Sequence, residues 1–198
     1  MMRSLPNILT FGRIALTPVI VALFFWPSEA ARWLALALFV LAAVSDFLDG
    51  WLARRFHTAS PIGRLFDPIA DKLLVGAVIV ALVWTGDAPV IPAIVIVCRE
   101  LLVSGLREYL AEHRVALPVT RLAKWKTTIQ MVALGFLILG AAGPEIADGP
   151  TTLMVGQVLF WLAALLTVIT GWVYLRSGLR RPALGDTEPT SRTTGASS

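Results

Sequence analysis

The apolar residues of this chain fall in long blocks, and the ionisable residues lie mostly between the blocks. The six longest runs without Asp, Glu, Lys, Arg or His occupy residues 14–28, 33–45, 73–86, 88–98, 127–144 and 149–175. A helix that crosses a bilayer needs about 20 mostly apolar residues, so only the last two runs suffice alone. The other four become membrane spans only if each takes in ionisable residues at one end. Ionisable residues inside a membrane usually belong to a functional site.

The pattern predicts helices, because lipid offers no partner for open backbone groups. We expect six of them, near residues 7–27, 32–54, 62–85, 89–111, 121–142 and 151–175. The predicted fold class is therefore an all-α integral membrane protein with six transmembrane helices. In this prediction residues 1–182 form the membrane domain, and residues 183–198, rich in Thr, Ser and Gly, form a disordered cytoplasmic tail. Alternatively, the first run is a signal peptide cut near Ala30, which leaves five spans.

Composition and charge indicate a membrane protein with a defined orientation. The chain is 57% hydrophobic and 15% charged, whereas a soluble domain has about a quarter of its residues charged. Connections 28–31, 86–88 and 143–150 contain acidic residues and no Lys or Arg, and most basic residues flank the opposite connections. The positive-inside rule then places both termini in the cytoplasm. In a membrane protein, the excess of basic residues behind the net charge of +4 belongs to the cytoplasmic side of the bilayer. We therefore expect membrane lipids and no nucleic acid as partners.

Four aspartates lie where the second predicted span leaves the membrane and the third enters it. They fall on two helical stripes, Asp46, Asp49, Gly50, Ala53 and Arg54 on the first, and Gly63, Asp67 and Asp71 on the second. A central Asp costs about 2.5–3.5 kcal/mol on insertion scales, so these carboxylates need compensating charge. If the stripes face each other, two hard cations such as Mg²⁺ or Mn²⁺ would balance the four carboxylates.

The neighbouring residues point to a phosphate-containing substrate. Gly50 and Ala53 remove side-chain bulk from the first stripe, and the guanidinium of Arg54 is a donor suited to phosphate. Ser60 and Pro61 resemble a helix cap followed by proline at the first helical position, which aims a helix N-terminus at the same place. Alternatively, the third helix begins at Pro68, with Asp67 as its cap.

Two other interpretations fit part of this pattern. Asp46 and Asp49 could form salt bridges with Arg54 or Arg99 across helices, which leaves the small residues and the second pair of aspartates unexplained. An acidic-ring cation channel or carrier is the alternative of a different class. Against a carrier, the carboxylates gather at one membrane face only.

The spacing of the two stripes resembles the complete signature of the CDP-alcohol phosphotransferase family. The pattern is Asp46-x-x-Asp49-Gly50-x-x-Ala53-Arg54, then eight residues, then Gly63-x-x-x-Asp67-x-x-x-Asp71. The resemblance implies a six-span membrane enzyme that moves a substituted phosphate from a CDP-linked donor to an alcohol and releases CMP. It also implies a homodimer.

The resemblance also assigns roles by position. Asp46, Asp49 and Asp67 would hold two metal ions, Mg²⁺ or Mn²⁺, and Asp71 would contact a metal and act as general base. The residues expected at the CDP-lipid are Gly50, Ala53, Arg54, Ser60 and Gly63. A polar stripe on the first helix, Asn7, Thr10 and Arg13, is assigned to the same ligand, with the alternative that Arg13 extends to the lipid headgroups.

Three further segments resemble the branch of that family that makes phosphatidylglycerol phosphate. They are LPNILTFGRI at 5–14, CRELLVSGLREYLAE at 98–112 and AKWKTTIQM at 123–131. In the cytoplasmic halves of spans four and five, donors for an acceptor phosphate are expected at Arg99, Arg107, Arg121, Lys124 and Thr128. The alternative for Arg107, Arg114, Arg121 and Lys126 is that they anchor helix ends to headgroups.

We therefore expect an enzyme of the cell's inner membrane whose site faces the cytoplasm. It would transfer the phosphatidyl group of CDP-diacylglycerol to sn-glycerol 3-phosphate and release CMP. The alternatives are another acceptor (inositol phosphate, serine or phosphatidylglycerol) or the cation carrier.

Overall fold

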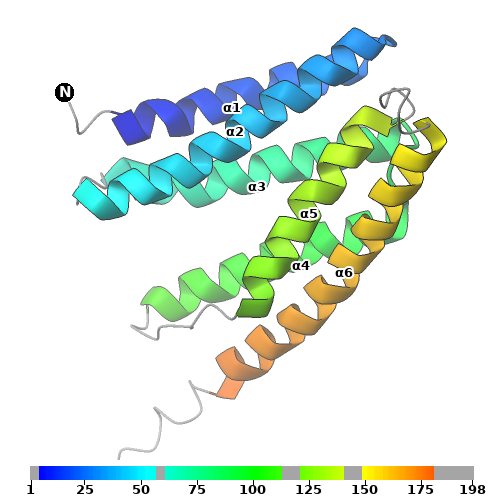
Figure 1. The fold of residues 1–198 in the computed structure, drawn as a ribbon. Coiled ribbons are helices and arrows are strands. Elements are labelled where there is room, and N and C mark those ends of the chain that lie inside the picture. The colour runs from blue at the N-terminus through cyan, green and yellow to red at the C-terminus, as the bar shows by residue number, and fades with distance from the viewer. Residues whose placement is uncertain (1–4, 57–60, 113–120, 141–148, 181–198) are drawn as a thin grey trace, which may run out of the picture.

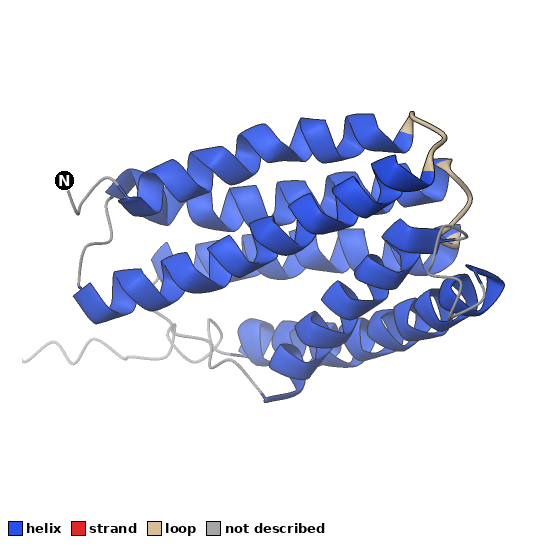
Figure 2. Ribbon diagram, turned by 45° about the horizontal axis from the view of Figure 1, so that its top comes forward, coloured by secondary structure: helices blue, strands red, loops and turns tan. Residues whose placement is uncertain are grey.

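The computed structural model describes residues 5–56, 61–112, 121–140 and 149–180, and within them the side chains of 10–46, 66, 69–111, 122–140 and 150–176. Every regular element in these ranges is an α-helix (Figure 2). The helices are α1 (Leu5–Phe24), α2 (Glu29–Phe56), α3 (Pro61–Trp84), α4 (Val90–Glu112), α5 (Arg121–Leu139) and α6 (Gly149–Arg180). Each overlaps one predicted range, so the all-helical fold is confirmed for the described chain. The predicted tail at 183–198 lies outside it.

Successive helices run in opposite directions along one bundle (Figure 1). The α1–α2 and α3–α4 connections lie at one end of the bundle, which we call the turn end. α2 ends and α3 begins at the other end, which we call the aspartate end. α1 packs on α2 and α3, and α5 packs mainly on α6. Contacts of α2 with α5 join these two groups, and α4 packs mainly on α6.

The starts of α2 and α3 define the two helices that carry the aspartate stripes. Ser28 caps α2, because its Oγ accepts a hydrogen bond of 3.1 Å from the backbone N–H of Ala31. α3 begins at Pro61 and continues past Pro68, so the start at Pro61 is confirmed and the alternative start at Pro68 is wrong. Both stripes therefore lie on single, uninterrupted helices.

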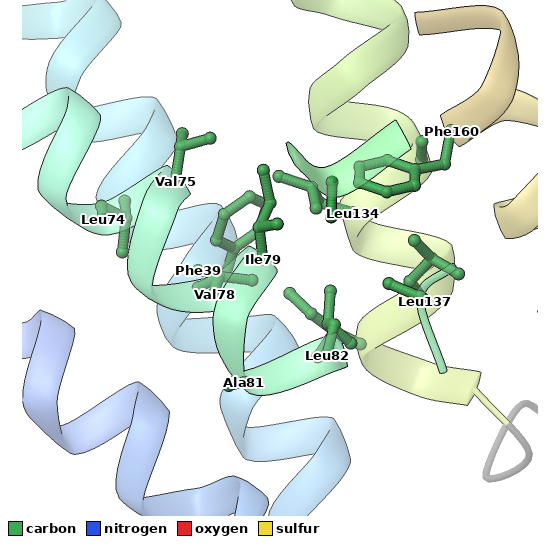
Figure 3. Close-up of a cluster of buried hydrophobic side chains, with 14 of the residues drawn as sticks. Phe39, Leu74, Val75, Val78, Ile79, Ala81, Leu82, Leu134, Leu137 and Phe160 are labelled. Carbon is green, nitrogen blue, oxygen red and sulfur yellow. The ribbon is translucent and has the colours of Figure 1, made fainter. Parts of the chain in front are cut away.

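A continuous stripe of apolar side chains on α3 forms the middle of the core. Leu74, Val78 and Leu82 recur every fourth residue and are at most 2% exposed, as the helical period requires. Figure 3 shows this stripe facing side chains of other helices: Phe39 of α2, Leu134 and Leu137 of α5, and Phe160 of α6. α3 is thus held on several sides, which fixes the rotation of the helix about its axis. That rotation sets the direction in which Asp71 projects, one turn before Leu74.

The outer surface of the bundle is also apolar. Val44, Val80, Leu101 and Leu165 are between 48% and 66% exposed, and helices that are apolar all round are typical of membrane spans. Among the described residues, two segments are long and apolar enough to cross a membrane, Leu122–Leu139 and Pro150–Arg176, and only 33% of each is buried. Core helices of a soluble protein would be mostly buried. The other four spans and the orientation of the termini stay predictions.

Polar groups join several elements at the turn end. Arg32 of α2 forms an ion pair with Asp87, with 2.8 Å between NH1 and Oδ2. The same oxygen accepts a hydrogen bond of 2.6 Å from Thr85 Oγ1, and the backbone carbonyl of Asp87 accepts one of 3.2 Å from Gln157 Nε2 of α6. After α5, Gly140 has φ +52°, and a Cβ there would lie 3.0 Å from Asp87 Oδ1. We call Arg32, Asp87 and Gln157 the turn-end cluster.

Candidate active site

Arg13 of α1 is paired with the first aspartate of the motif. Its NH1 lies 2.5 Å from Asp46 Oδ1; the Arg13 side chain is 1% exposed and that of Asp46 is 46% exposed. A buried guanidinium requires an anionic partner, because its charge has lost its water. Thr10 is also buried one turn earlier, and Thr17 Oγ1 donates 2.9 Å to the Arg13 carbonyl one turn later. The alternative that Arg13 extends to headgroups is wrong, since the side chain faces the bundle.

Asp71 of α3 is exposed at a small cavity between α3, α4 and α5. The cavity has a volume of about 80 Å³, and its polar lining consists of Asp71, Lys72, Glu100, Lys126, Thr127 and Gln130. The Asp71 carboxylate also lies within electrostatic range of Asp46. Asp46 and Asp71 thus bring the two stripes within electrostatic reach of each other, and the facing of all four carboxylates stays a prediction.

Lys126 provides a buried positive charge in this cavity. Its side chain is 4% exposed, and its Nζ donates a hydrogen bond to Glu100 Oε1. An ammonium group has three donors, so the contact with Glu100 leaves capacity for a ligand. The alternative that Lys126 anchors a helix end to headgroups is wrong, because it points into the bundle.

Gln130 follows Lys126 by one turn and lines the same cavity. It is 3% exposed, and its Oε1 accepts no hydrogen bond from any residue the structure describes. Sequence reasoning missed Lys126 and Gln130 as site residues. Their spacing of four on one helix face was the available signal, but an apolar helix in lipid gives no indication of which face turns inward.

Arg99 does not enter this cavity. Its NH2 donates 3.0 Å to Thr170 Oγ1 and its NH1 donates 3.2 Å to Glu100 Oε1. Its guanidinium carbon lies 5.6 Å from the centre of the Tyr174 ring, and Gly171 leaves space for its stem. The predicted acceptor-phosphate role of Arg99 is therefore not supported, because the side chain is committed to α6.

The remaining predicted residues divide into two groups. Arg107, Lys124 and Thr128 are exposed and do not line the cavity, and Thr128 Oγ1 bonds instead to the Lys124 carbonyl at 3.2 Å. The second group lies outside the described side chains: Asn7, Asp49, Gly50, Ala53, Arg54, Ser60, Gly63, Asp67 and Arg121.

The donor chemistry of the described site fits a hard divalent cation. Asp46 and Asp71 contribute carboxylate oxygens, which Mg²⁺ and Mn²⁺ prefer, and the Arg13 contact involves only one oxygen of Asp46. Within the described side chains, no group of three or more His, Cys, Asp or Glu could hold a metal ion. The other two aspartates of the motif belong to the undescribed side chains.

Comparison with known proteins decides the family. A family model for CDP-alcohol phosphatidyltransferases matches residues 3–169. The chain belongs to this family. The resemblance of the aspartate motif is thereby confirmed, and the family assignment replaces the alternative of a cation carrier.

Individual relatives of this CDP-alcohol phosphatidyltransferase cover most of its length. A CDP-diacylglycerol–glycerol-3-phosphate 3-phosphatidyltransferase of Rickettsia typhi is 48% identical over 89% of this chain and 97% of its own. A protein of the same name from Cereibacter sphaeroides is 39% identical over 89% of this chain and 96% of its own. A cardiolipin synthase (CMP-forming) of Oryza sativa is 34% identical over 87% of this chain and 56% of its own.

Proposed function

We infer that this chain is an enzyme that transfers the phosphatidyl group of CDP-diacylglycerol to sn-glycerol 3-phosphate. The products are phosphatidylglycerol phosphate and CMP. The names of the relatives from Rickettsia typhi and Cereibacter sphaeroides support this donor and acceptor. The reaction belongs to phospholipid biosynthesis.

The observation that carries the proposal is the cavity beside Asp71. A carboxylate that can accept a proton and a buried ammonium that can hold an anion line the same small space. An acceptor that is both an alcohol and a phosphomonoester needs these two groups together. Serine and phosphatidylglycerol carry no phosphomonoester, so Lys126 favours glycerol 3-phosphate over them.

We assign Asp46, Asp49, Asp67 and Asp71 to two Mg²⁺ or Mn²⁺ ions. When bound, such ions neutralise pyrophosphate charge and favour departure of the leaving oxygen. Arg13 positions Asp46 through their ion pair, and the expected direct contact of Arg13 with the donor stays a prediction. Thr10, one turn earlier on α1, is also buried, and we keep it as a candidate contact of the CDP-lipid.

The proposed chemistry needs no covalent enzyme intermediate. Asp71 takes the proton of the primary hydroxyl of glycerol 3-phosphate. The alcohol oxygen then forms a bond to the lipid-side phosphorus, and the bond from that phosphorus to the bridging oxygen breaks. CMP leaves with that oxygen. Lys126 holds the acceptor's phosphate, which turns the hydroxyl toward Asp71.

We propose that the donor binds along the two stripes themselves. Gly50, Ala53 and Gly63 would leave space for the cytidine and pyrophosphate, and Arg54 and Ser60 would donate hydrogen bonds to them. Asn7 remains a further candidate contact of the CDP-lipid.

CMP release by the purified protein, reconstituted in liposomes with CDP-diacylglycerol and Mg²⁺ or Mn²⁺, tests the function. Wild type should release CMP with glycerol 3-phosphate in preference to inositol phosphate, serine or phosphatidylglycerol. Asp71→Asn should lower kcat by at least about 100-fold, the usual contribution of general base catalysis. Glu29→Gln, at the exposed start of α2, is the matched control. Preference for another acceptor, or activity retained in Asp71→Asn, contradicts the proposal.

We also propose a multi-pass homodimer in the cytoplasmic membrane with the site facing the cytoplasm. The basic flanks of the aspartate end support this orientation. Reporter fusions at both termini test it, and crosslinking in membranes tests the dimer. A terminus outside the cytoplasm contradicts the topology.

A further inference from the structure

The Gln130 side chain combines burial with an unused acceptor. It is 3% exposed, and among the described residues no donor reaches its Oε1. Buried polar atoms in proteins nearly always have a partner, and leaving one unpaired costs free energy. The Gln130 side chain forms part of the wall of the cavity that also contains Asp71 and Lys126. The cavity is therefore the place where its partner would bind.

The size and lining of the cavity limit what that partner can be. A water molecule needs about 10–15 Å³ of such cavity space, so about 80 Å³ accepts a ligand group of several non-hydrogen atoms. Apart from its polar residues, the wall consists of apolar side chains such as Val75, Ile79 and Ile96. This space suits a short polyol fragment.

The chemistry of the three polar groups differs, and each selects a different part of a ligand. Lys126 can only donate, so it selects an anion, and ionised Asp71 accepts a proton from the reacting hydroxyl. Gln130 Oε1 can only accept, so it needs a donor, which a phosphate dianion does not provide. A second hydroxyl group supplies that donor.

We propose that Gln130 is a specificity-determining residue whose Oε1 accepts a hydrogen bond from the secondary, non-reacting hydroxyl of the acceptor. The inference rests on the proposed function, because it takes glycerol 3-phosphate as the acceptor. A site that hydrogen-bonds a substrate hydroxyl rejects the analogue that lacks it, since the buried protein atom is then left unpaired.

The test compares two acceptors that differ only in that hydroxyl. Glycerol 3-phosphate and propane-1,3-diol monophosphate both carry a primary hydroxyl and a phosphate, and CMP release in CDP-diacylglycerol liposomes measures kcat/KM for each. Wild type should prefer glycerol 3-phosphate by at least about tenfold. In Gln130→Met, which keeps the length of the side chain, the preference should fall to within about twofold. The KM for CDP-diacylglycerol should not change.

Two further variants separate recognition from structure. Gln130→Glu keeps an acceptor oxygen, so it should retain the preference although its carboxylate repels the phosphate and raises KM for both acceptors. Gln157→Leu, which alters the glutamine at the turn end, is the matched control and should keep the wild-type ratio.

The outcomes distinguish the two proposals. No CMP release by wild type with glycerol 3-phosphate contradicts the proposed function. CMP release without discrimination in wild type contradicts the role of Gln130 alone, whether or not Gln130→Met folds. Equal loss for both acceptors in Gln130→Met means that the oxygen binds water or supports packing, and this also overturns the inference.

Discussion

Two buried basic side chains organise the candidate site at the scale of single residues. Arg13 is held by Asp46 and Lys126 by Glu100, and both pairs bring a charge from another helix next to an aspartate stripe. Buried charges persist only when they are paired. The pairing with Glu100 offsets part of the cost of burying the Lys126 ammonium inside an apolar wall.

We predict that Lys126→Met raises KM for glycerol 3-phosphate by about 10–100-fold, the worth of one hydrogen bond to a charged group. KM for CDP-diacylglycerol should stay constant, because the proposed site assigns Lys126 to the acceptor and not to the CDP-lipid. CMP release at varied acceptor concentration measures the change.

The control for this variant is the double substitution Lys126→Met with Glu100→Gln. It removes the unpaired carboxylate that the single variant leaves behind, so it should recover thermal stability but not acceptor affinity. An unchanged KM for glycerol 3-phosphate in the single variant would refute the role of Lys126.

At the scale of elements, small residues determine how closely helices approach. A Cβ on Gly156 of α6 would lie 3.0 Å from Leu137 Cδ2 and 3.1 Å from the Leu137 backbone nitrogen. Backbone cannot move aside as a flexible side chain can, so α5 and α6 depend on the glycine. Close approach through small residues is a usual source of helix association in membranes.

Gly156→Ala should lower the free energy of unfolding by about 1–3 kcal/mol, the cost of overpacking, seen as a lower Tm in detergent. Gly105→Ala on α4 is the matched control, because a Cβ there meets nothing within 4 Å. It should be neutral or raise stability by up to about 1 kcal/mol, since alanine favours helix. Equal Tm values for the two variants would show that α5 and α6 do not need the close contact.

At the scale of the whole molecule, the bundle has polar groups at both ends and apolar surface between them. The turn-end cluster joins α2 and α6 through Asp87. The candidate site lies apart from it, at the cavity lined by Asp71, Glu100 and Lys126, and Figure 1 shows the aspartate end, where α2 ends and α3 begins, opposite the turn end. The apolar core of α3 separates the two ends. The stabilising polar contacts of the turn end are thus separate from the candidate active site.

We therefore expect Asp87→Asn to lower stability without changing substrate affinity. Loss of the ion pair leaves Arg32 largely buried without its carboxylate, at a cost of about 3 kcal/mol, and Tm in detergent should fall accordingly. The KM values for both substrates, measured well below Tm, should match wild type. A large change in either KM would mean that the two ends are coupled.

The sequence alone determined the helices, the aspartate stripes and the family. Apolar runs, proline at the start of α3 and the spacing of Asp46 through Asp71 are local properties, and they are visible without a fold. Charge runs likewise predicted an orientation.

Only the tertiary structure decided which polar residues face inward. Lys126 and Gln130 enter the cavity, Arg99 turns to α6, and Arg13 reaches Asp46. The physical reason is that lipid and core are equally apolar, so hydrophobic periodicity does not distinguish the two faces of a spanning helix. Packing between helices sets the rotation of each helix about its axis, and this rotation decides which residues line the site.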